Sequence, residues 1–93
     1  MLVTLTEFTN AARDGAGNVL PLGGGRKSCH CLDANGSFPA LDDETTMVRI
    51  ATDTAIQMDI AGGETDTDDE LFLPGIEFIA VGGGEVLTIQ AVV

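Results

Sequence analysis

Apolar and polar residues alternate along the second half of this chain with a period of two, which is typical of a β-strand that buries one face. In residues 47–51, Val48 and Ile50 flank Arg49. Residues 55–60 and 86–93 continue the same alternation. The pattern predicts three short strands whose apolar side chains enter one core.

Glycine, proline and acidic residues separate these segments. The run 64–70, ETDTDDE, has no apolar residue and predicts a solvated loop. A short apolar stretch at 71–73 ends at a Pro-Gly dipeptide, and a β-branched and aromatic strand is expected at 77–81. The glycines at 82–84 then supply a turn that tolerates positive φ.

The first part of the chain, up to about residue 45, is less regular and rich in glycine. Residues 2–6 alternate as a strand does. Two more strands are predicted at 19–22 and 28–32, with a turn at the triple glycine 23–25 between them. The segment 10–14, NAARD, could form a single helical turn but is too short to nucleate a longer helix.

Seven or eight short strands spaced about eight to twelve residues apart predict an all-β fold, a small β-sandwich or β-barrel of jelly-roll type. A chain of 93 residues is expected to form a single domain, 1–93, with one core. Such a domain buries only about 60 to 65% of the surface of its unfolded chain, so we expect further subunits to stabilise it.

The net charge of the chain narrows the classes of partner that it is expected to bind. Four basic and fifteen acidic residues give a formal net charge of −11, which repels the phosphates of nucleic acids and anionic membrane surfaces. We therefore expect neither as a partner. The N-terminus has no basic region and too short an apolar run for a signal peptide, and no apolar run of transmembrane length occurs, so synthesis and initial residence in the cytoplasm are expected.

The segment GGGRKS at 23–28 is similar to a phosphate-binding loop. That motif has Gly directly before Lys, and Arg26 holds this place here. We therefore interpret the glycines as a turn and expect no nucleotide site.

Cys29, His30 and Cys31 are three side chains that can bind metals, but structural zinc sites need C-x2-C spacing and a second ligand pair. On a strand, His30 points away from both cysteines, and a disulfide between neighbours two residues apart would be strained. We expect two reduced, metal-free cysteines facing the core and a histidine on the surface. The alternative is a metal site assembled across subunits.

Two acidic clusters carry carboxylates that could bind calcium: Asp42, Asp43 and Glu44, and Asp66, Asp68, Asp69 and Glu70. Neither has the spacing of an EF-hand, so solvated loops are expected, and a calcium-dependent binding module is the alternative. The chain has one histidine, no G-x-S-x-G motif and no recognisable pair of nucleophile and base. We expect no enzyme activity, no catalytic residue and no cofactor.

Residues 45–93 resemble the small β-structured virion proteins of tailed bacteriophages. The segments that carry the resemblance are 48–51, 56–60, 73–81 and 84–89. The resemblance implies a decoration or cement protein that binds the outer surface of the phage capsid, reinforces the shell and has the major capsid protein as its partner. A connector or tail component is the alternative within the same class, and either would be located in the virion.

The cations of the chain are the candidate interface residues, because an attaching face on an acidic protein is expected to be apolar or locally basic. These are Arg13, Arg26, Lys27 and Arg49. We also expect self-association. The resemblance favours a trimer, whereas composition alone favours a dimer.

Overall fold

The computed structural model describes residues 1–13, 19–63 and 65–92, and it describes their side chains except for those of 10–13, 19–24 and 26. This part of the chain contains eight strands and no helix, so no helix in it could cross a membrane. The strands are β1 (Val3–Arg13), β2 (Val19–Leu32), β3 (Gly36–Ser37), β4 (Met47–Thr52), β5 (Ile56–Ala61), β6 (Thr67–Phe72), β7 (Gly75–Ala80) and β8 (Val86–Ala91).

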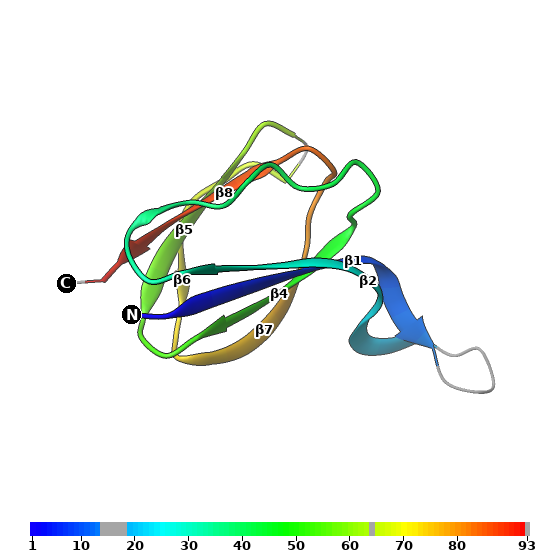
Figure 1. The fold of residues 1–93 in the computed structure, drawn as a ribbon, viewed down its shortest axis with the longest axis horizontal. Coiled ribbons are helices and arrows are strands. Elements are labelled where there is room, and N and C mark those ends of the chain that lie inside the picture. The colour runs from blue at the N-terminus through cyan, green and yellow to red at the C-terminus, as the bar shows by residue number, and fades with distance from the viewer. Residues whose placement is uncertain (14–18, 64, 93) are drawn as a thin grey trace.

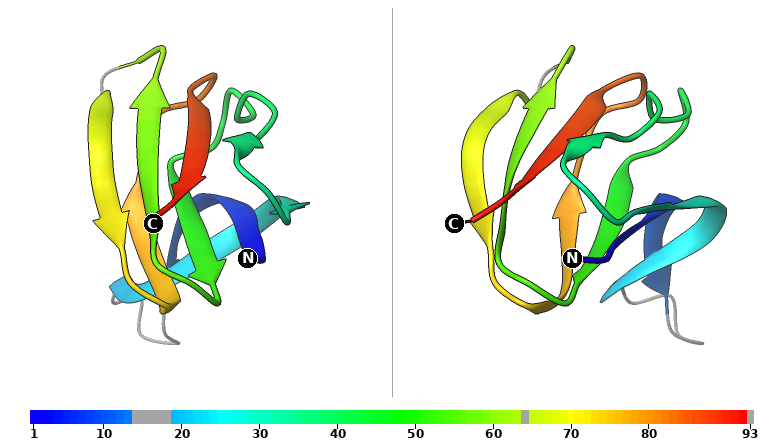
Figure 2. Two further views of the ribbon diagram at one scale, coloured as in Figure 1. Left: turned by 90° about the vertical axis from the view of Figure 1, so that its left-hand side faces the viewer. Right: turned by 60° about the vertical axis from the view of Figure 1, so that its left-hand side comes forward.

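The strands form two antiparallel sheets that face each other as a sandwich (Figures 1 and 2). Sheet A has the order β2-β1-β4-β7, and sheet B has the order β3-β8-β5-β6. This is the strand order of a jelly roll. A hairpin joins β1 to β2 here, so the two ends of the chain lie at β1 and β8. The predicted all-β sandwich is confirmed.

The core lies between the sheets, where the alternation of the sequence directs its apolar side chains. In sheet A, Val3, Leu5, Val48 and Ile50 are buried. Sheet B contributes every second residue of β5 and β8, and the connection from β3 to β4 closes one side. The members of this second group are Ile56, Met58, Ile60, Leu87, Ile89, Phe38 and Leu41.

The first strands are longer than the sequence predicted. β2 is one strand of 14 residues, so the triple glycine 23–25 lies inside a strand and is not a turn between two. Residues 10–13 belong to β1, which contradicts the helical turn predicted there; Asp14 lies outside the described residues. The physical reason is pairing at long range, since Ala11 lies opposite Gly23 in the ladder that joins the two strands.

The β1–β2 pair extends beyond the sandwich as a two-stranded ribbon (Figure 1). β4 accompanies β1 only from Val3 to Phe8, whereas β2 pairs with β1 as far as Arg13. At the start of the ribbon, Gly25 has φ +68°, and a Cβ there would lie 2.0 Å from Thr9 Oγ1. Only glycine fits this position without strain.

The sequence predicted a loop for the acidic run. This prediction is wrong in part, because Thr67 to Glu70 belong to β6 at the edge of sheet B. Asp69 has φ +54°, and its N–H donates to Asp59 Oδ1 at 2.7 Å. Bulges and surface charges are common in edge strands, which can be largely exposed and need no regular apolar face. The alternation of apolar and polar residues therefore did not reveal this strand. In the apolar stretch that follows, only Phe72 is buried, and Leu71 and Leu73 are exposed.

Candidate interaction surface

The outer face of sheet A is unusually apolar for so acidic a chain. Cross-strand partners in a sheet point to the same side, and Val3 and Leu5 point into the core, so the alternate register positions form the outer face. We call this surface the sheet A face. Among described side chains it consists of Thr4, Thr6, Phe8, Cys29, Cys31, Met47, Arg49, Ala51, Ile76, Phe78 and Ala80.

Among the side chains that the structure describes, the sheet A face carries no carboxylate, although fifteen of the 93 residues are acidic. Arg49 is the charged residue among them. The outer face of sheet B differs, since hydroxyl, amide and carboxylate groups cover much of it. Those residues include Ser37, Gln57, Asp59, Thr88 and Gln90. The molecule therefore has one ordinary solvated face and one face suited to contact with another molecule.

Arg49 lies at the centre of the sheet A face, opposite Thr6 on β1 and Phe78 on β7. Its Nη2 is 3.5 Å from Thr6 Oγ1, and its buried Nε has no hydrogen-bond partner among the described residues. A buried donor without an acceptor costs free energy, and a guanidinium binds carboxylates in a planar, bidentate geometry. Among the described residues, Arg49 forms no ion pair, so the part of its guanidinium outside the buried Nε is left without a carboxylate.

Aromatic side chains flank the arginine. The ring of Phe8 lies 5.9 Å from that of Phe78, with the planes tilted by 45°. Met47 lies next to Phe8 in the register, and Ala80 lies next to Met47. Phe8 is only 9% exposed, so Phe78, Met47 and Arg49 are the members of this group that a partner could reach. Residues of these types are enriched in protein interfaces, which favours a protein partner.

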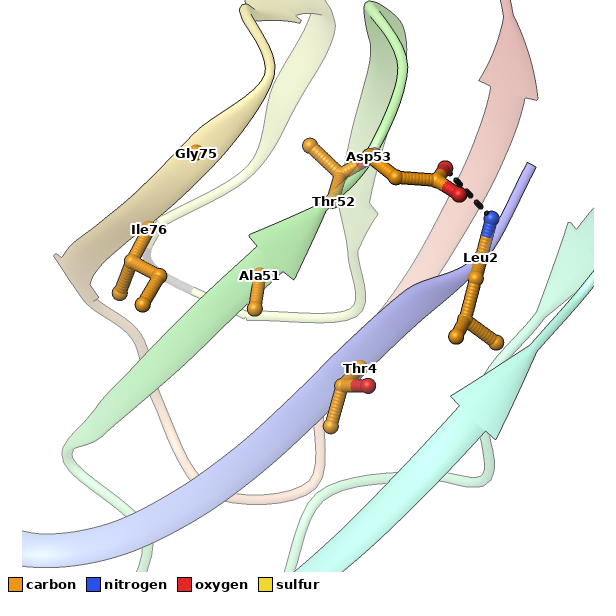
Figure 3. A pocket seen from close by; sticks show the side chains of 7 residues that line it. All are labelled: Leu2, Thr4, Ala51, Thr52, Asp53, Gly75 and Ile76. Atoms are coloured by element: carbon orange, nitrogen blue, oxygen red, sulfur yellow. Dashed lines mark hydrogen bonds between the residues drawn. The ribbon is translucent and has the colours of Figure 1, made fainter.

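A shallow depression lies at one end of the sheet A face (Figure 3). Leu2, Thr4, Ala51 and Ile76 line it, and 67% of the Ile76 side chain is exposed. The Leu2 N–H donates to Asp53 Oδ1 at 2.8 Å, which fixes the start of the chain beside the β4–β5 turn. The depression is therefore held in shape by the N-terminal segment.

A second group of exposed apolar residues surrounds the β6–β7 turn. Leu71 is 55% exposed and Leu73 is 70% exposed, and both line a depression with Pro74 and Ile76. We call these four residues the hairpin patch. Because Ile76 belongs to both surfaces, the hairpin patch continues the sheet A face around the edge of the sandwich.

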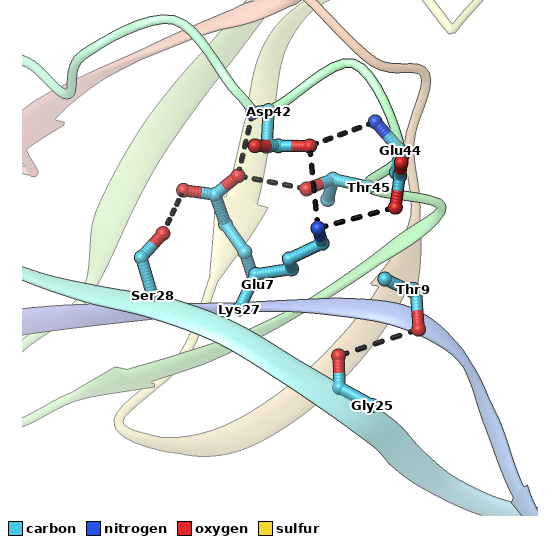
Figure 4. A network of polar contacts seen from close by, with 8 residues as sticks. All are labelled: Glu7, Thr9, Gly25, Lys27, Ser28, Asp42, Glu44 and Thr45. Atoms are coloured by element: carbon cyan, nitrogen blue, oxygen red, sulfur yellow. Dashed lines mark hydrogen bonds and ion pairs between the residues drawn. The ribbon is translucent and has the colours of Figure 1, made fainter.

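The structure places the four candidate cations differently. Arg49 lies on the sheet A face, whereas Lys27 Nζ is 3.1 Å from Glu44 and 3.9 Å from Asp42, so it is paired within its own chain (Figure 4). Hydrogen bonding to Glu44 and the charges of both carboxylates raise the pKa of Lys27. The side chains of Arg13 and Arg26 lie outside the described residues.

The expected orientation of Cys29, His30 and Cys31 is wrong. Both cysteines are free and exposed on the sheet A face, and their sulfur atoms lie 3.4–3.5 Å from hydroxyls of β1. His30 points inward because it is the register partner of Leu5. The three side chains alternate between the two faces as predicted. Pairing with β1 decides which face is buried, and this pairing cannot be predicted from residues 29–31 alone.

Glu7 is the acceptor of a polar network at one end of the core (Figure 4). Its carboxylate is only 2% exposed and accepts four hydrogen bonds. The donors are Ser28 Oγ (2.7 Å), the Asp42 N–H (2.8 Å), Thr45 Oγ1 (2.8 Å) and, when its Nε2 carries a proton, His30 (3.0 Å). Burial alone would raise the pKa of Glu7, but these hydrogen bonds outweigh it and lower the pKa below 4.5.

A second buried carboxylate, Glu85, joins two other loops. It is fully buried and accepts hydrogen bonds from the N–H and hydroxyl of Thr65 and from the Gly82 N–H. The sequence analysis singled out neither Glu7 nor Glu85. The signal for Glu7 was present, because it follows Val3 and Leu5 in the alternation of β1 and so lies on the buried face.

The acidic clusters do not form a metal site in the described part of the chain, where no three His, Cys, Asp or Glu side chains converge. Asp42 accepts the Glu44 N–H at 2.9 Å and contacts Lys27, and Asp66 accepts the Gly63 N–H at 2.9 Å. These carboxylates hold their own loops in place.

Comparison with known proteins gives no relative. No protein-family model, no curated protein and no solved structure matches the chain.

Proposed function

We propose that this chain is a structural virion protein that binds the outer surface of a phage capsid and reinforces the shell. The observation that carries the proposal is the sheet A face, whose described side chains are largely apolar and include no carboxylate, on a chain with a net charge of −11. The proposal also rests on the resemblance of residues 45–93 to small phage virion proteins. No further support comes from the comparisons.

In this proposal the sheet A face is the attaching side, and sheet B faces solvent. Arg49 receives a carboxylate of the major capsid protein, and the aromatic residues beside it exclude water from the contact. A protein that binds only the assembled lattice stabilises it by mass action, and several weak contacts made by one oligomer add as avidity.

The first test is composition. Virions of the phage that encodes this chain should contain it, as measured by quantitative mass spectrometry. A copy number that scales with the major capsid protein supports decoration, whereas a few copies per particle supports the connector or tail alternative. Absence from purified virions contradicts both.

The second test is rebinding of purified chain to particles that lack it, with a matched pair of variants. Thr4→Glu adds one negative charge to the sheet A face, and Gln57→Glu adds the same charge to the outer face of sheet B. We expect Thr4→Glu to weaken binding at least tenfold and Gln57→Glu to bind as the natural chain does. Equal binding by both variants would remove the sheet A face from the interface.

A further inference from the structure

The sandwich has four strand edges, and three of them are protected against pairing with another chain. β3 has only two residues. β6 carries three consecutive acidic residues and a register shift opposite Met58 and Ile60. β2 has two register shifts, one of them beside Gly25. Short length, charge and bulges are the ways in which natural sheets prevent edge-to-edge association.

β7 is the least protected of the four edges, and Glu77 is its one charged residue. It pairs with β4 over all six of its residues without a register shift, and no strand pairs with its other edge in the described part of the chain. Its sequence, GIEFIA, contains one charge, no lysine and no proline. The exposed hairpin patch lies beside it. The unpaired N–H and C=O groups of such an edge are satisfied best by another strand.

We propose that β7 pairs antiparallel with β7 of a second copy, across a twofold axis at Phe78, so that the two A sheets become one continuous sheet. A twofold axis perpendicular to the sheet pairs side chains that share a face. In the register centred on Phe78, the two phenylalanines lie opposite each other, Ile76 lies opposite Ala80, and Glu77 lies opposite Ile79. The central pair is aromatic, Ile76 meets the smaller Ala80, and no like charges meet.

Charge favours a second copy at this edge and this register. Two chains of net charge −11 repel each other at most surfaces, but among the described side chains the sheet A face and β7 carry one carboxylate, that of Glu77. A register centred on Glu77 would place two carboxylates opposite each other. The acidic residues of β6 lie on the neighbouring edge of sheet B. They repel those of the second copy, which keeps the contact to sheet A and weakens it at low salt.

This inference stands independently of the proposed capsid function. It also favours twofold symmetry over the threefold symmetry that the resemblance implies. The paired sheets would present two sheet A faces side by side, which doubles the apolar area available to any partner.

Disulfide trapping tests the register directly. In a Cys29→Ser, Cys31→Ser background, Phe78→Cys should form a disulfide-linked dimer on mild oxidation, because paired residues in antiparallel strands are about 4.5–5.5 Å apart at Cα, within disulfide range. A mixture of Ile76→Cys and Ala80→Cys chains should yield the mixed dimer. Gln90→Cys, exposed on the outer face of sheet B, should stay monomeric under the same conditions.

A variant that disrupts the β7–β7 pairing complements the disulfide test. Phe78→Lys places two like charges across the axis, so light scattering should show a monomer at concentrations where the natural chain is dimeric, with an unchanged circular dichroism spectrum. Association of the natural chain should strengthen as salt rises. A natural chain that stays monomeric at all salt concentrations overturns the proposal. So does a disulfide from Phe78→Cys to Cys29 or Cys31 in a second variant that keeps both native cysteines, because it would indicate head-to-tail pairing of β7 with β2.

Discussion

His30 Nε2 lies 3.0 Å from Oε2 of Glu7, a carboxylate buried at the end of the core. The register that pairs Leu5 with His30 and Thr6 with Cys29 brings Ser28 opposite Glu7, on the same side of the sheet as His30. Ser28 Oγ donates to the same oxygen, Glu7 Oε2, at 2.7 Å. A charged residue in the core is thereby satisfied by groups from the neighbouring strand and from the loop at 42–45.

Stability should fall in acid because of Glu7. Its pKa is lower in the folded state than in the unfolded chain, so the ionised carboxylate stabilises the fold above the unfolded pKa, near 4.5. That contribution is lost as the pH falls through the folded pKa. We expect the urea midpoint to fall below about pH 5. Glu7→Gln should lose about 1–3 kcal/mol at neutral pH and show a shallower fall.

The control for this prediction is Asp33→Asn, a change at an exposed residue outside the network. This variant should keep the stability and the acid dependence of the natural chain. If Glu7→Gln has the same pH profile as Asp33→Asn, the Glu7 network does not account for the acid sensitivity.

Gly83 should not tolerate a side chain. A Cβ at this position would lie 2.2 Å from the carbonyl oxygen of Asp43, a backbone atom that cannot move away cheaply. Gly83→Ala should therefore lose at least about 2 kcal/mol in chemical unfolding, or fail to fold. Gly36→Ala is the matched control, because its Cβ would meet no atom within 4 Å, and it should change stability by no more than about 0.5 kcal/mol.

Arg49 should contribute little to the stability of the isolated chain. Its Nε is buried without an acceptor, and its contact to Thr6 is long at 3.5 Å. Arg49→Met keeps the apolar stem and removes the unpaired donor, so the free energy of unfolding should stay the same or rise by up to about 1 kcal/mol. Thr45→Val, which removes a buried donor to Glu7, should instead lose about 1–3 kcal/mol. A large loss for Arg49→Met would assign that residue a structural role.

Both cysteines should react with Ellman's reagent in the folded protein, because Cys29 and Cys31 are exposed on the sheet A face. Two thiols per chain should titrate without denaturant, and elemental analysis should find no bound zinc after dialysis. Thiols that titrate only after unfolding would show that the cysteines are buried in the core. Zinc that survives dialysis would support a site assembled across subunits.

The strands that could be predicted from sequence are those with one buried and one polar face. β1, β4, β5 and β8 each bury alternate apolar residues, and this pattern is visible without a structure. β2 and β6 could not be predicted in full. The triple glycine belongs to β2 because Gly23 and Gly24 pair with β1, and the acidic β6 is an edge strand with few buried residues. Both depend on contacts distant in sequence.

The interaction surface was harder to predict than the fold. Sequence analysis identified Arg49 as a candidate cation, but the sheet A face consists of residues from four strands that only the register brings together. One signal was available, since Ile76, Phe78 and Ile79 place apolar side chains on both faces of β7. A strand that is apolar on both faces indicates cover on both sides, and on the outer face of β7 Ile76 is 67% exposed.

The two buried carboxylates divide the loops into those that tolerate insertions and those that do not. Glu7 joins β2 to the loop at 42–45, and Glu85 joins Thr65 to Gly82, so the three loops at the ribbon end are fastened to strands or to each other. The turn at 33–35, at the opposite end, has exposed side chains and no buried carboxylate. A peptide to be displayed on this scaffold should therefore be inserted there, where added residues displace no group of the core.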